Sequence, residues 1–260
     1  MLSRSQSLSQ LFILEKLYDQ NWKVSQSAMA ELEGCEHGAI NKQDIRGSND
    51  LIIMSVNTRS LRKHYPEIQR LHLKRNYNMI LLQETWLHAT SDPSEFAIDK
   101  LFLHSNSVGL GKGVASYCTQ EFVVTESITK NDCQVIKTSS KIFDVINVYR
   151  SSSCKNFSDL LTSIIDTDRK TIICGDTNMD VRKNEGEVLC DKLAAIGFEQ
   201  LLTKASHVEG GLIDQVFVND HLKNYFHVKI NQISNRFRQG FIDNKSLNVD
   251  ILAGTIINDS

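Results

Sequence analysis

Polar side chains stand at the ends of several apolar segments in this sequence. The segment "IICGDTN" carries Asp176 and Asn178, "LIIMSVN" ends on Asn57, and "ILLQE" ends on Glu84. Short apolar runs of this kind are typical of strands buried on both faces, and Gly175 is expected to end the first of them. Layered α/β proteins tend to keep their chemistry just beyond the carboxyl ends of such strands. These four side chains are therefore candidates for one functional site.

Two further residues fit the same description. Tyr149 follows the apolar run "VINV", and Asp214 lies early in "LIDQVFV". Each candidate also has an ordinary structural interpretation: Asn57 as a helix cap, Tyr149 as a core aromatic, Asp214 as a buried acid bonded to backbone, and Asp176 as a turn former. The coincidence of several such residues at strand ends favours a site.

The residue types indicate which chemistry this site would perform. Carboxylates and amides without His or Cys spacing suit a hard cation such as Mg²⁺, with Mn²⁺ as an alternative. Mg²⁺ usually takes one or two carboxylates and completes its shell with water and phosphate oxygens, so Glu84 is a suitable ligand. Asp176 would then polarise a water molecule, while Asn178 and Tyr149 hydrogen-bond a phosphate. This chemistry is phosphodiester hydrolysis.

Helical and strand-like segments alternate along the chain that must position these residues. Pro66 is expected to open a helix that runs to about Asn76, and four strand-like segments follow one another between residues 113 and 149. The pattern predicts an α/β (α+β) fold: a four-layer α/β/β/α sandwich of two mainly antiparallel sheets between helices.

Three regions are expected along the chain. Residues 1–49 form an N-terminal extension, partly helical or disordered, and residues 50–232 form the domain that carries the site. The run "YFHVKINQI" is predicted to be the last strand, so residues 233–260 are interpreted as a divergent C-terminal tail.

Composition excludes several other classes of protein. Hydrophobic content of 41% and charged content of 23% are ordinary for a soluble globular chain of 260 residues, and no apolar run approaches the roughly 18 residues of a membrane span. The six cysteines have no C-x-x-C spacing, which argues against zinc and favours a reduced intracellular protein of the nucleus or cytoplasm. We expect a monomer that does not bind membranes. The net charge of −2 does not by itself predict nucleic-acid binding.

An ordered set of short motifs gives the site a family context. The series "SVNTRSL", "ILLQETWL", "GKGVASY", "INVYR", "IICGDTNMD" and "GGLIDQVFV" resembles the endonuclease/exonuclease/phosphatase superfamily over residues 50–230. That superfamily includes DNase I-like enzymes, apurinic endonucleases and the endonuclease domains of non-LTR retrotransposons. The motifs N-x-R-S-L, Q-E-T-W-L and V-Y-R are most similar to the mobile-element branch.

The resemblance implies a DNase I-like fold and a role for each candidate. Asn57 and Glu84 would hold Mg²⁺, and Tyr149 would touch the scissile phosphate or the leaving group. Asp176 would activate or orient the attacking water, and Asn178 would fix the phosphate. DNA is the implied partner, with RNA as an alternative.

The basic stretch after Asn57 supplies two candidates for contact with that partner. Arg59 and Arg62 are expected at the mouth of the site, where they would contact phosphate or DNA, although a solvated helix face is the competing interpretation of the stretch.

One part of the family pattern is missing. The family ends with a Ser-Asp-His motif after one more strand, and Asp214 matches the acid that orients this His. No Asp-His pair follows residue 232, and the pair Asp220–His221 comes one strand too early. We therefore predict a retrotransposon-type, Mg²⁺-dependent endonuclease impaired by loss of the catalytic His. A non-catalytic nucleic-acid or protein-binding remnant and a phosphoesterase for a small or lipid substrate are the alternatives.

Overall fold

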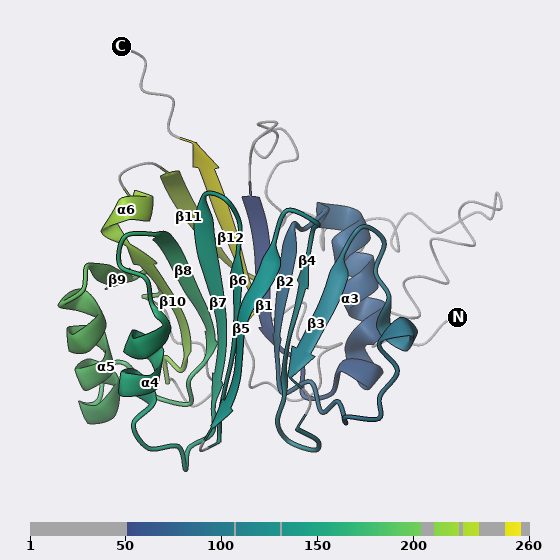
Figure 1. Cartoon of the computed structure of the whole chain (residues 1–260), viewed down its shortest axis with the longest axis horizontal. Helices are drawn as coiled ribbons and strands as arrows, with labels where there is room; N and C mark the ends of the chain where they lie inside the picture. Colours follow the sequence, from purple (N-terminus) through teal and green to yellow (C-terminus); the bar gives the residue numbers. More distant parts are fainter. Residues whose placement is uncertain are drawn as a thin grey trace, which may run out of the picture.

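The computed structural model describes residues 51–106, 108–130, 132–203, 211–223, 226–233 and 248–255, so the expected extension over residues 1–49 lies outside the described residues. Two six-stranded sheets pack face to face in the middle of the molecule, with helices on both outer sides (Figure 1). The predicted four-layer sandwich is confirmed.

Each sheet is mainly antiparallel but contains one parallel pair. The first sheet has the order β11-β12-β1-β2-β4-β3, and the second has the order β5-β6-β7-β8-β10-β9. The pairs β1–β2 and β7–β8 are parallel. The strands of the first sheet are β1 (Leu51–Asn57), β2 (Met79–Gln83), β3 (Phe102–Asn106), β4 (Val114–Cys118), β11 (Phe226–Ile233) and β12 (Asn248–Thr255). The strands of the second sheet are β5 (Val123–Lys130), β6 (Cys133–Ser139), β7 (Phe143–Arg150), β8 (Lys170–Asp176), β9 (Phe198–Gln200) and β10 (Asp214–Asn219).

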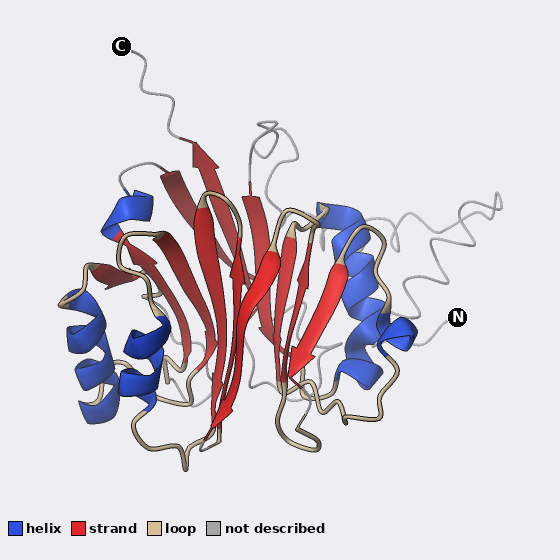
Figure 2. Ribbon diagram, viewed as in Figure 1, coloured by secondary structure: helices blue, strands red, loops and turns tan. Residues whose placement is uncertain are grey.

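Helices form the two outer layers (Figure 2). The first sheet is covered by α3, and the second is covered by α4 and α5. The bounds of the helical elements are α3 (Leu61–Arg75), the 3₁₀ turn η1 (Pro93–Phe96), α4 (Phe157–Ile164), α5 (Asn184–Ala194) and α6 (Asp220–Lys223). In the described part of the chain, no helix has the length and apolar character needed to cross a membrane.

Three apolar clusters correspond to the three interfaces between the four layers. The central cluster joins side chains such as Ile53 and Leu81 of the first sheet to Val145 and Ile172 of the second. Each fully buried aliphatic side chain contributes roughly 1.5–3 kcal/mol through the hydrophobic effect. This burial holds the sheets face to face.

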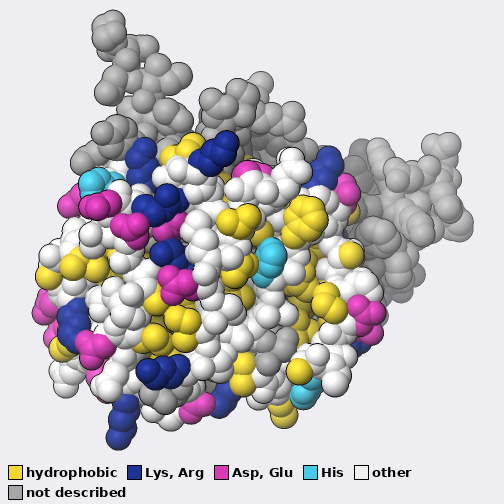
Figure 3. Space-filling model, in the orientation of Figure 1, with side chains coloured by type: hydrophobic (Ala, Val, Ile, Leu, Met, Phe, Trp, Pro, Cys, Tyr) yellow, Lys and Arg dark blue, Asp and Glu magenta, His cyan; other side chains and the backbone are white. Residues whose placement is uncertain are grey.

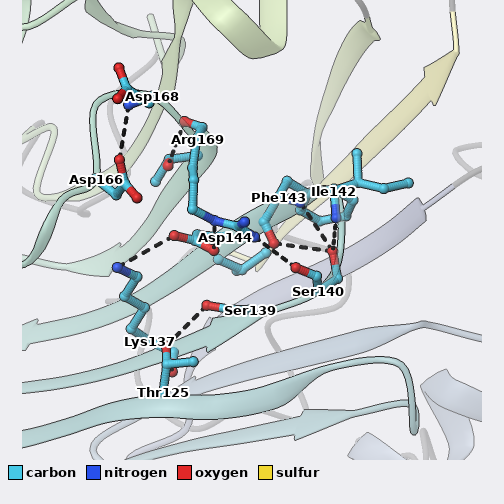
Figure 4. A network of polar contacts seen from close by, with 12 residues as sticks. Thr125, Lys137, Ser139, Ser140, Ile142, Phe143, Asp144, Asp166, Asp168 and Arg169 are labelled. Carbon is cyan, nitrogen blue, oxygen red and sulfur yellow. Dashed lines mark hydrogen bonds and ion pairs between the residues drawn. The ribbon is translucent and has the colours of Figure 1, made fainter.

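A buried ion network fastens the start of β7 (Figure 4). Asp144 is fully buried, and its carboxylate accepts a hydrogen bond from Arg169 Nε at 2.8 Å and lies 3.4 Å from Lys137 Nζ. Arg169 also donates to the carbonyl of Ser140 at 2.7 Å, and Lys137 donates to that of Ile164 at 2.9 Å. Because β7 runs from Phe143 to Arg150, this network lies at the opposite end of the strand from Tyr149.

Two local expectations were wrong. The helix α3 begins at Leu61, and Pro66 lies inside it. Leu61 is buried and its backbone N–H donates to Thr85 O at 2.8 Å, so packing starts the helix before the proline. Gly175 does not end β8 but lies within it.

The C-terminal region contributes a strand that we did not predict. Strand β12 pairs antiparallel with both β1 and β11 and separates them in the sheet. "YFHVKINQI" is therefore followed by another strand, within the region expected to be a divergent tail.

The cysteines only partly match the expectation of a reduced protein. Cys118 and Cys174 are buried free thiols within β4 and β8. Cys133 and Cys154, however, form a disulfide with a Cα–Cα distance of 6.1 Å. Antiparallel pairing of β6 with β7 places Cys133 opposite Arg150, which brings the following loop back beside the start of β6.

Candidate active site

Three strand ends from two different sheets meet at one cluster of polar side chains. Asn57, at the end of β1, donates from Nδ2 to Asp176 Oδ2 at 2.7 Å, and Asp176 ends β8 in the other sheet. The same amide nitrogen donates to Glu84 Oε1 at 2.9 Å. Asn57 and Asp176 are both buried. The structure thus brings together three of the residues that were singled out by their strand-end positions.

Asp176 has the most perturbed environment in the cluster. Burial raises the pKa of its carboxyl to about 6, and the neighbouring charge of Glu84 adds to this effect. Hydrogen bonds from the Asn178 backbone N–H, at 2.9 Å, and from Asn57 act in the opposite direction, as does the positive charge of Arg59. Burial thus disfavours the ionised carboxylate, and a bound cation would favour it.

Tyr149 lies beside Asp176 in the parallel pair β7–β8. Burial holds its pKa well above the usual range, and the charges of Glu84 and Asp176 contribute. The side chain is therefore a neutral phenol near neutral pH, and its hydroxyl donates to Gly111 O at 3.3 Å. A neutral phenol beside carboxylates can donate a hydrogen bond to a phosphate oxygen.

Asn178 is fixed by both its backbone and its side chain. Its backbone N–H donates to Asp176, and its Nδ2 donates to Arg150 O at 2.7 Å. These bonds hold Asn178 in a left-handed conformation with φ 49°.

Several residues around the site that are not glycine also have positive φ angles. Positive φ angles occur at Arg59 (44°), Ser60 (112°), Glu84 (47°), Trp86 (55°) and Asn178 (49°). Such conformations are strained for L-residues and persist where surrounding structure fixes them. Backbone bonds continue the β1–β2 contact past the strand ends, for example from Ser60 N to Glu84 O at 2.9 Å. The strain is therefore part of a preorganised site.

A glycine-rich loop forms one wall of the site, and the sequence analysis did not assign it a role. In this loop the carbonyls of Gly113 and Lys112 accept from the backbone N–H groups of Thr85 and Trp86, at 3.1 and 2.9 Å. A Cβ atom at Gly113 would lie 2.4 Å from Thr85 Oγ1. The glycines of "GLGKG" were the available signal, since they permit this close approach.

Arg150 is a second residue whose importance the sequence did not reveal. Its side chain is buried, and its guanidinium donates to Cys154 O at 3.0 Å and to Glu185 Oε2 at 2.9 Å. A longer bond of 3.4 Å reaches Thr177 O. Arg150 thus connects the end of β7, the loop after it, and the first turn of α5 behind Asn178.

Asp214 and His221 end up far from each other. Asp214 lies directly opposite Asp176 in the antiparallel pair β10–β8, so it belongs to the site region. His221 lies on α6, which follows the other end of β10, where Val218 is opposite Ile172. The Asp220–His221 pair therefore lies at the opposite end of the sheet from the polar cluster.

The two arginines proposed for phosphate contact are also placed differently. Arg59 donates from its backbone N–H to Asn57 Oδ1 at 3.2 Å, and its charge lowers the pKa values of both Asp176 and Tyr149. Arg62 instead forms an ion pair with Glu95 at 2.7 Å and lies over the ring of Phe96 at 5.3 Å. The guanidinium of Arg62 is therefore bound to residues of η1 and not to the cluster.

The carboxylate oxygens of Glu84 and Asp176 are ligands suited to a hard cation. Within the described ranges, no group of three or more His, Cys, Asp or Glu side chains could hold a metal ion. Two carboxylates nevertheless meet the usual requirement of Mg²⁺, which takes water and phosphate for the rest. Asn57 points its nitrogen at both carboxylates, while its Oδ1 accepts from Arg59 N at 3.2 Å. The amide would have to turn over for its oxygen to become a ligand.

A pocket of about 490 Å³ begins at Asn178 and extends along the start of α5. Its lining carries both signs of charge, with Arg182 and Lys183 beside Glu185. Asp180 belongs to this wall: hydrogen bonds from Arg182 lower its pKa to about 2, so it is a turn residue with a local partner.

Comparison with known proteins identifies the architecture. No family model matches the sequence, and no curated protein matches it. Among solved structures, the AP endonuclease LMAP from Leishmania major matches with a TM-score of 0.64 and 11% identity, covering 92% of this chain and 98% of that one. The endonuclease domain of TRAS1, a telomere-specific non-LTR retrotransposon, matches with a TM-score of 0.62 and 11% identity, covering 79% and 99%.

A third structure is a variant of the 3′ phosphatase NExo from Neisseria, bound to a product DNA hairpin. It matches with a TM-score of 0.61 and 16% identity over 79% of this chain and 99% of that one. At such low identity these likenesses show a shared fold, and that fold is the DNase I-like one.

Proposed function

We propose that this chain, which has the DNase I-like fold of the endonuclease/exonuclease/phosphatase superfamily, is a metal-dependent phosphodiesterase that acts on nucleic acid. Mg²⁺ is the proposed ion, and DNA is the proposed substrate, as expected for an endonuclease of retrotransposon type. The observation that carries this proposal is the hydrogen-bonded cluster of Asn57, Glu84 and Asp176, with Tyr149 beside it.

Each side chain has a role that its surroundings favour. Glu84 and Asp176 would hold the cation, which supplies charge stabilisation at the phosphate. Asp176, whose pKa is raised to about 6, is also suited to orient the attacking water and take its proton. Asn178 would donate a hydrogen bond to a phosphate oxygen, and Tyr149 would do so after its hydroxyl turned away from Gly111 O.

Turnover by this site is proposed to be slow. The sequence contains no histidine after His227, so the Asp-His pair that the family resemblance implies before the last strand is absent. A positioned group that stabilises charge in the transition state is typically worth a factor of about 10²–10⁴ in rate. The same observation supports the second candidate, a nucleic-acid-binding domain that has lost catalysis.

Any affinity for DNA must come from local cations. Acidic and basic side chains are interspersed over the face shown in Figure 3, and the formal net charge is −2. Arg59 lies beside the site, whereas Arg62 is paired with Glu95.

Metal binding gives the first test. Isothermal titration with Mg²⁺ should detect a site in the parent that Glu84→Ala abolishes, while Glu121→Ala, which removes an exposed carboxylate in the β4–β5 turn, leaves it intact. Equal binding by the parent and Glu84→Ala would show that Glu84 is not a ligand.

DNA binding gives the second test. Binding of a short duplex by Arg59→Ala should depend less on salt, with the slope of log K against log salt reduced by about 0.9. Arg62→Ala is the matched control and should keep the parent slope. Plasmid nicking in Mg²⁺ or Mn²⁺ then separates the two candidate functions: slow nicking that is lost in Asp176→Ala supports the enzyme, and binding without nicking supports the non-catalytic domain.

A further inference from the structure

Buried polar side chains interrupt the apolar space between the sheets, immediately behind the proposed site. Gln83, the last residue of β2, precedes Glu84, and Asn147 of β7 lies two residues before Tyr149. Gln83 Nε2 donates to Asn147 Oδ1 at 2.7 Å, so this bond crosses from one sheet to the other. Both side chains are almost completely buried.

Further bonds extend this contact to two more strands. Asn147 Nδ2 donates to Ala115 O at 2.9 Å and to Ser116 Oγ at 3.2 Å, both in β4. Gln83 Nε2 is also 3.3 Å from Ser55 Oγ in β1. The amide pair therefore joins β7 of the second sheet to three neighbouring strands of the first.

Burying two amides in an apolar interface costs free energy unless they are hydrogen-bonded, and an aliphatic pair would fill the space without that requirement. The hydrophobic contacts elsewhere between the sheets have no preferred direction. A hydrogen bond fixes both distance and orientation. The Gln83–Asn147 pair thus supplies what the surrounding apolar contacts lack, a defined offset between the sheets.

The site depends on that offset because its members belong to different sheets. Asn57 and Glu84 lie at the ends of strands of the first sheet, whereas Tyr149 is the next-to-last residue of β7 and Asp176 ends β8 in the second. Sliding of one sheet over the other would lengthen the 2.7 Å contact between Asn57 and Asp176 and separate Glu84 from Asp176.

We infer that Gln83 and Asn147 are positioning residues that hold the two halves of the site in register. This inference rests on the proposed function for its purpose. Whether the Gln83–Asn147 hydrogen bond sets the geometry of the cluster can be measured without any catalytic assay.

Exchanging the two amide side chains tests this hydrogen bond between the sheets, because the double exchange keeps the combined length of the two side chains unchanged. Gln83→Asn shortens the reach across the gap, Asn147→Gln lengthens it, and the double variant Gln83→Asn/Asn147→Gln restores the sum. The readouts on the full chain are the Kd for Mn²⁺ by electron paramagnetic resonance and the NMR signal of the Asn57 side-chain amide without metal. Asn219→Gln is the matched control, since Asn219 is a buried amide bonded to Arg169 O and Thr171 N within the second sheet, at the other end of β10.

We expect each single exchange to weaken Mn²⁺ binding about 10-fold or more and to shift the Asn57 signal, and the double variant to recover most of both. Asn219→Gln should lower the unfolding temperature without either effect. Single variants with the parent Kd and an unmoved Asn57 signal would overturn the inference, as would a double variant that behaves like the singles. If the parent binds no Mn²⁺, the proposed metal is wrong and the Asn57 signal alone decides this inference.

Discussion

The carboxyl of Asp176 titrates at about 6 because burial and the charge of Glu84 disfavour its ionised form, whereas an unperturbed Asp titrates at 3.8. Between these values the folded chain binds the proton more tightly than the unfolded chain does. The free energy of unfolding therefore falls as pH rises through this window, by up to about 3 kcal/mol, and remains lower above it. The proposed function thus uses a group that destabilises the empty site.

Replacing Asp176 by Asn should accordingly stabilise the chain at pH 8. Removing the buried charge outweighs the roughly 1 kcal/mol lost when an amide replaces an acceptor facing Asn57, so we expect a net gain of about 1–2 kcal/mol. At pH 4 the parent is already protonated, so the gain should vanish. Urea unfolding at the two pH values measures both. Asp180→Asn is the control, because the pKa of that carboxyl is lowered and its loss should reduce the free energy of unfolding at pH 8. A gain for Asp176→Asn that is equal at both pH values would contradict the argument.

Sequence pattern singled out residues that the fold brings together, but it did not predict their contacts. Asn57, Glu84 and Asp176 were found because an apolar run followed by a polar residue is a local signal. The bond from Asn57 to Asp176 joins positions 119 residues apart, and its donor faces the carboxylates rather than a metal. The buried interactions of Arg150 likewise depend on the loop and helix that fold over it, which no local spacing encodes.

At the scale of elements, the close approach of β7 to β8 explains the glycine in "ICGDTN". Gly175 has φ 145°, and a Cβ there would lie 1.9 Å from Val148 O in the backbone of β7. The backbone of β7 cannot yield without breaking the parallel pairing that places Tyr149 beside Asp176. The glycine is therefore required inside the strand, not at its end.

Gly175→Ala should destabilise the chain by about 3 kcal/mol or more, or prevent folding, because the added carbon overlaps backbone in a tightly packed interior. Gly111→Ala is the matched control: its φ is also positive, at 75°, but no atom lies within 4 Å of the added carbon. It should cost only the strain of that conformation, roughly 1–2 kcal/mol. Soluble yield and urea unfolding compare the two variants, and equal losses would show that crowding at Gly175 is unimportant.

The strands that were missed lack the apolar run or the regular alternation of the predicted ones. Strands β1, β2, β8 and β10 are largely buried and read as continuous apolar runs. Strand β3, "FLHSN", is partly exposed at the edge of its sheet, and β9 has only three residues, so neither carries an apolar run. Strand β12, "NVDILAGT", was missed because Asp250 and Gly254 interrupt its pattern, and its place is set by pairing with β1.

At the scale of the whole molecule, the site lies where the ends of strands from both sheets meet, and β12 begins in this region. Because β12 is antiparallel to β1, its first residue, Asn248, lies opposite Val56, one position before Asn57. The family resemblance implies a Ser-Asp-His motif at the start of such a strand. Just before and at the first residue of β12 the sequence reads Ser246, Leu247 and Asn248, so neither Asp nor His stands at that point of the chain.

The double substitution Leu247→Asp/Asn248→His should therefore increase catalysis rather than impair it. Position 248 pairs with Val56 near the carboxyl end of β1, so a histidine there would stand at the edge of the sheet where Glu84 and Asp176 meet, and it would supply the residue type that the family resemblance implies. We expect the rate of plasmid nicking in Mg²⁺ to rise by a factor of about 10²–10⁴ over the parent, the usual value of such a group. The same substitutions combined with Asp176→Ala should give no increase, which separates a restored site from a contaminating nuclease. A double variant that folds and binds Mg²⁺ but nicks no faster than the parent would contradict the slow-enzyme proposal and favour the non-catalytic domain.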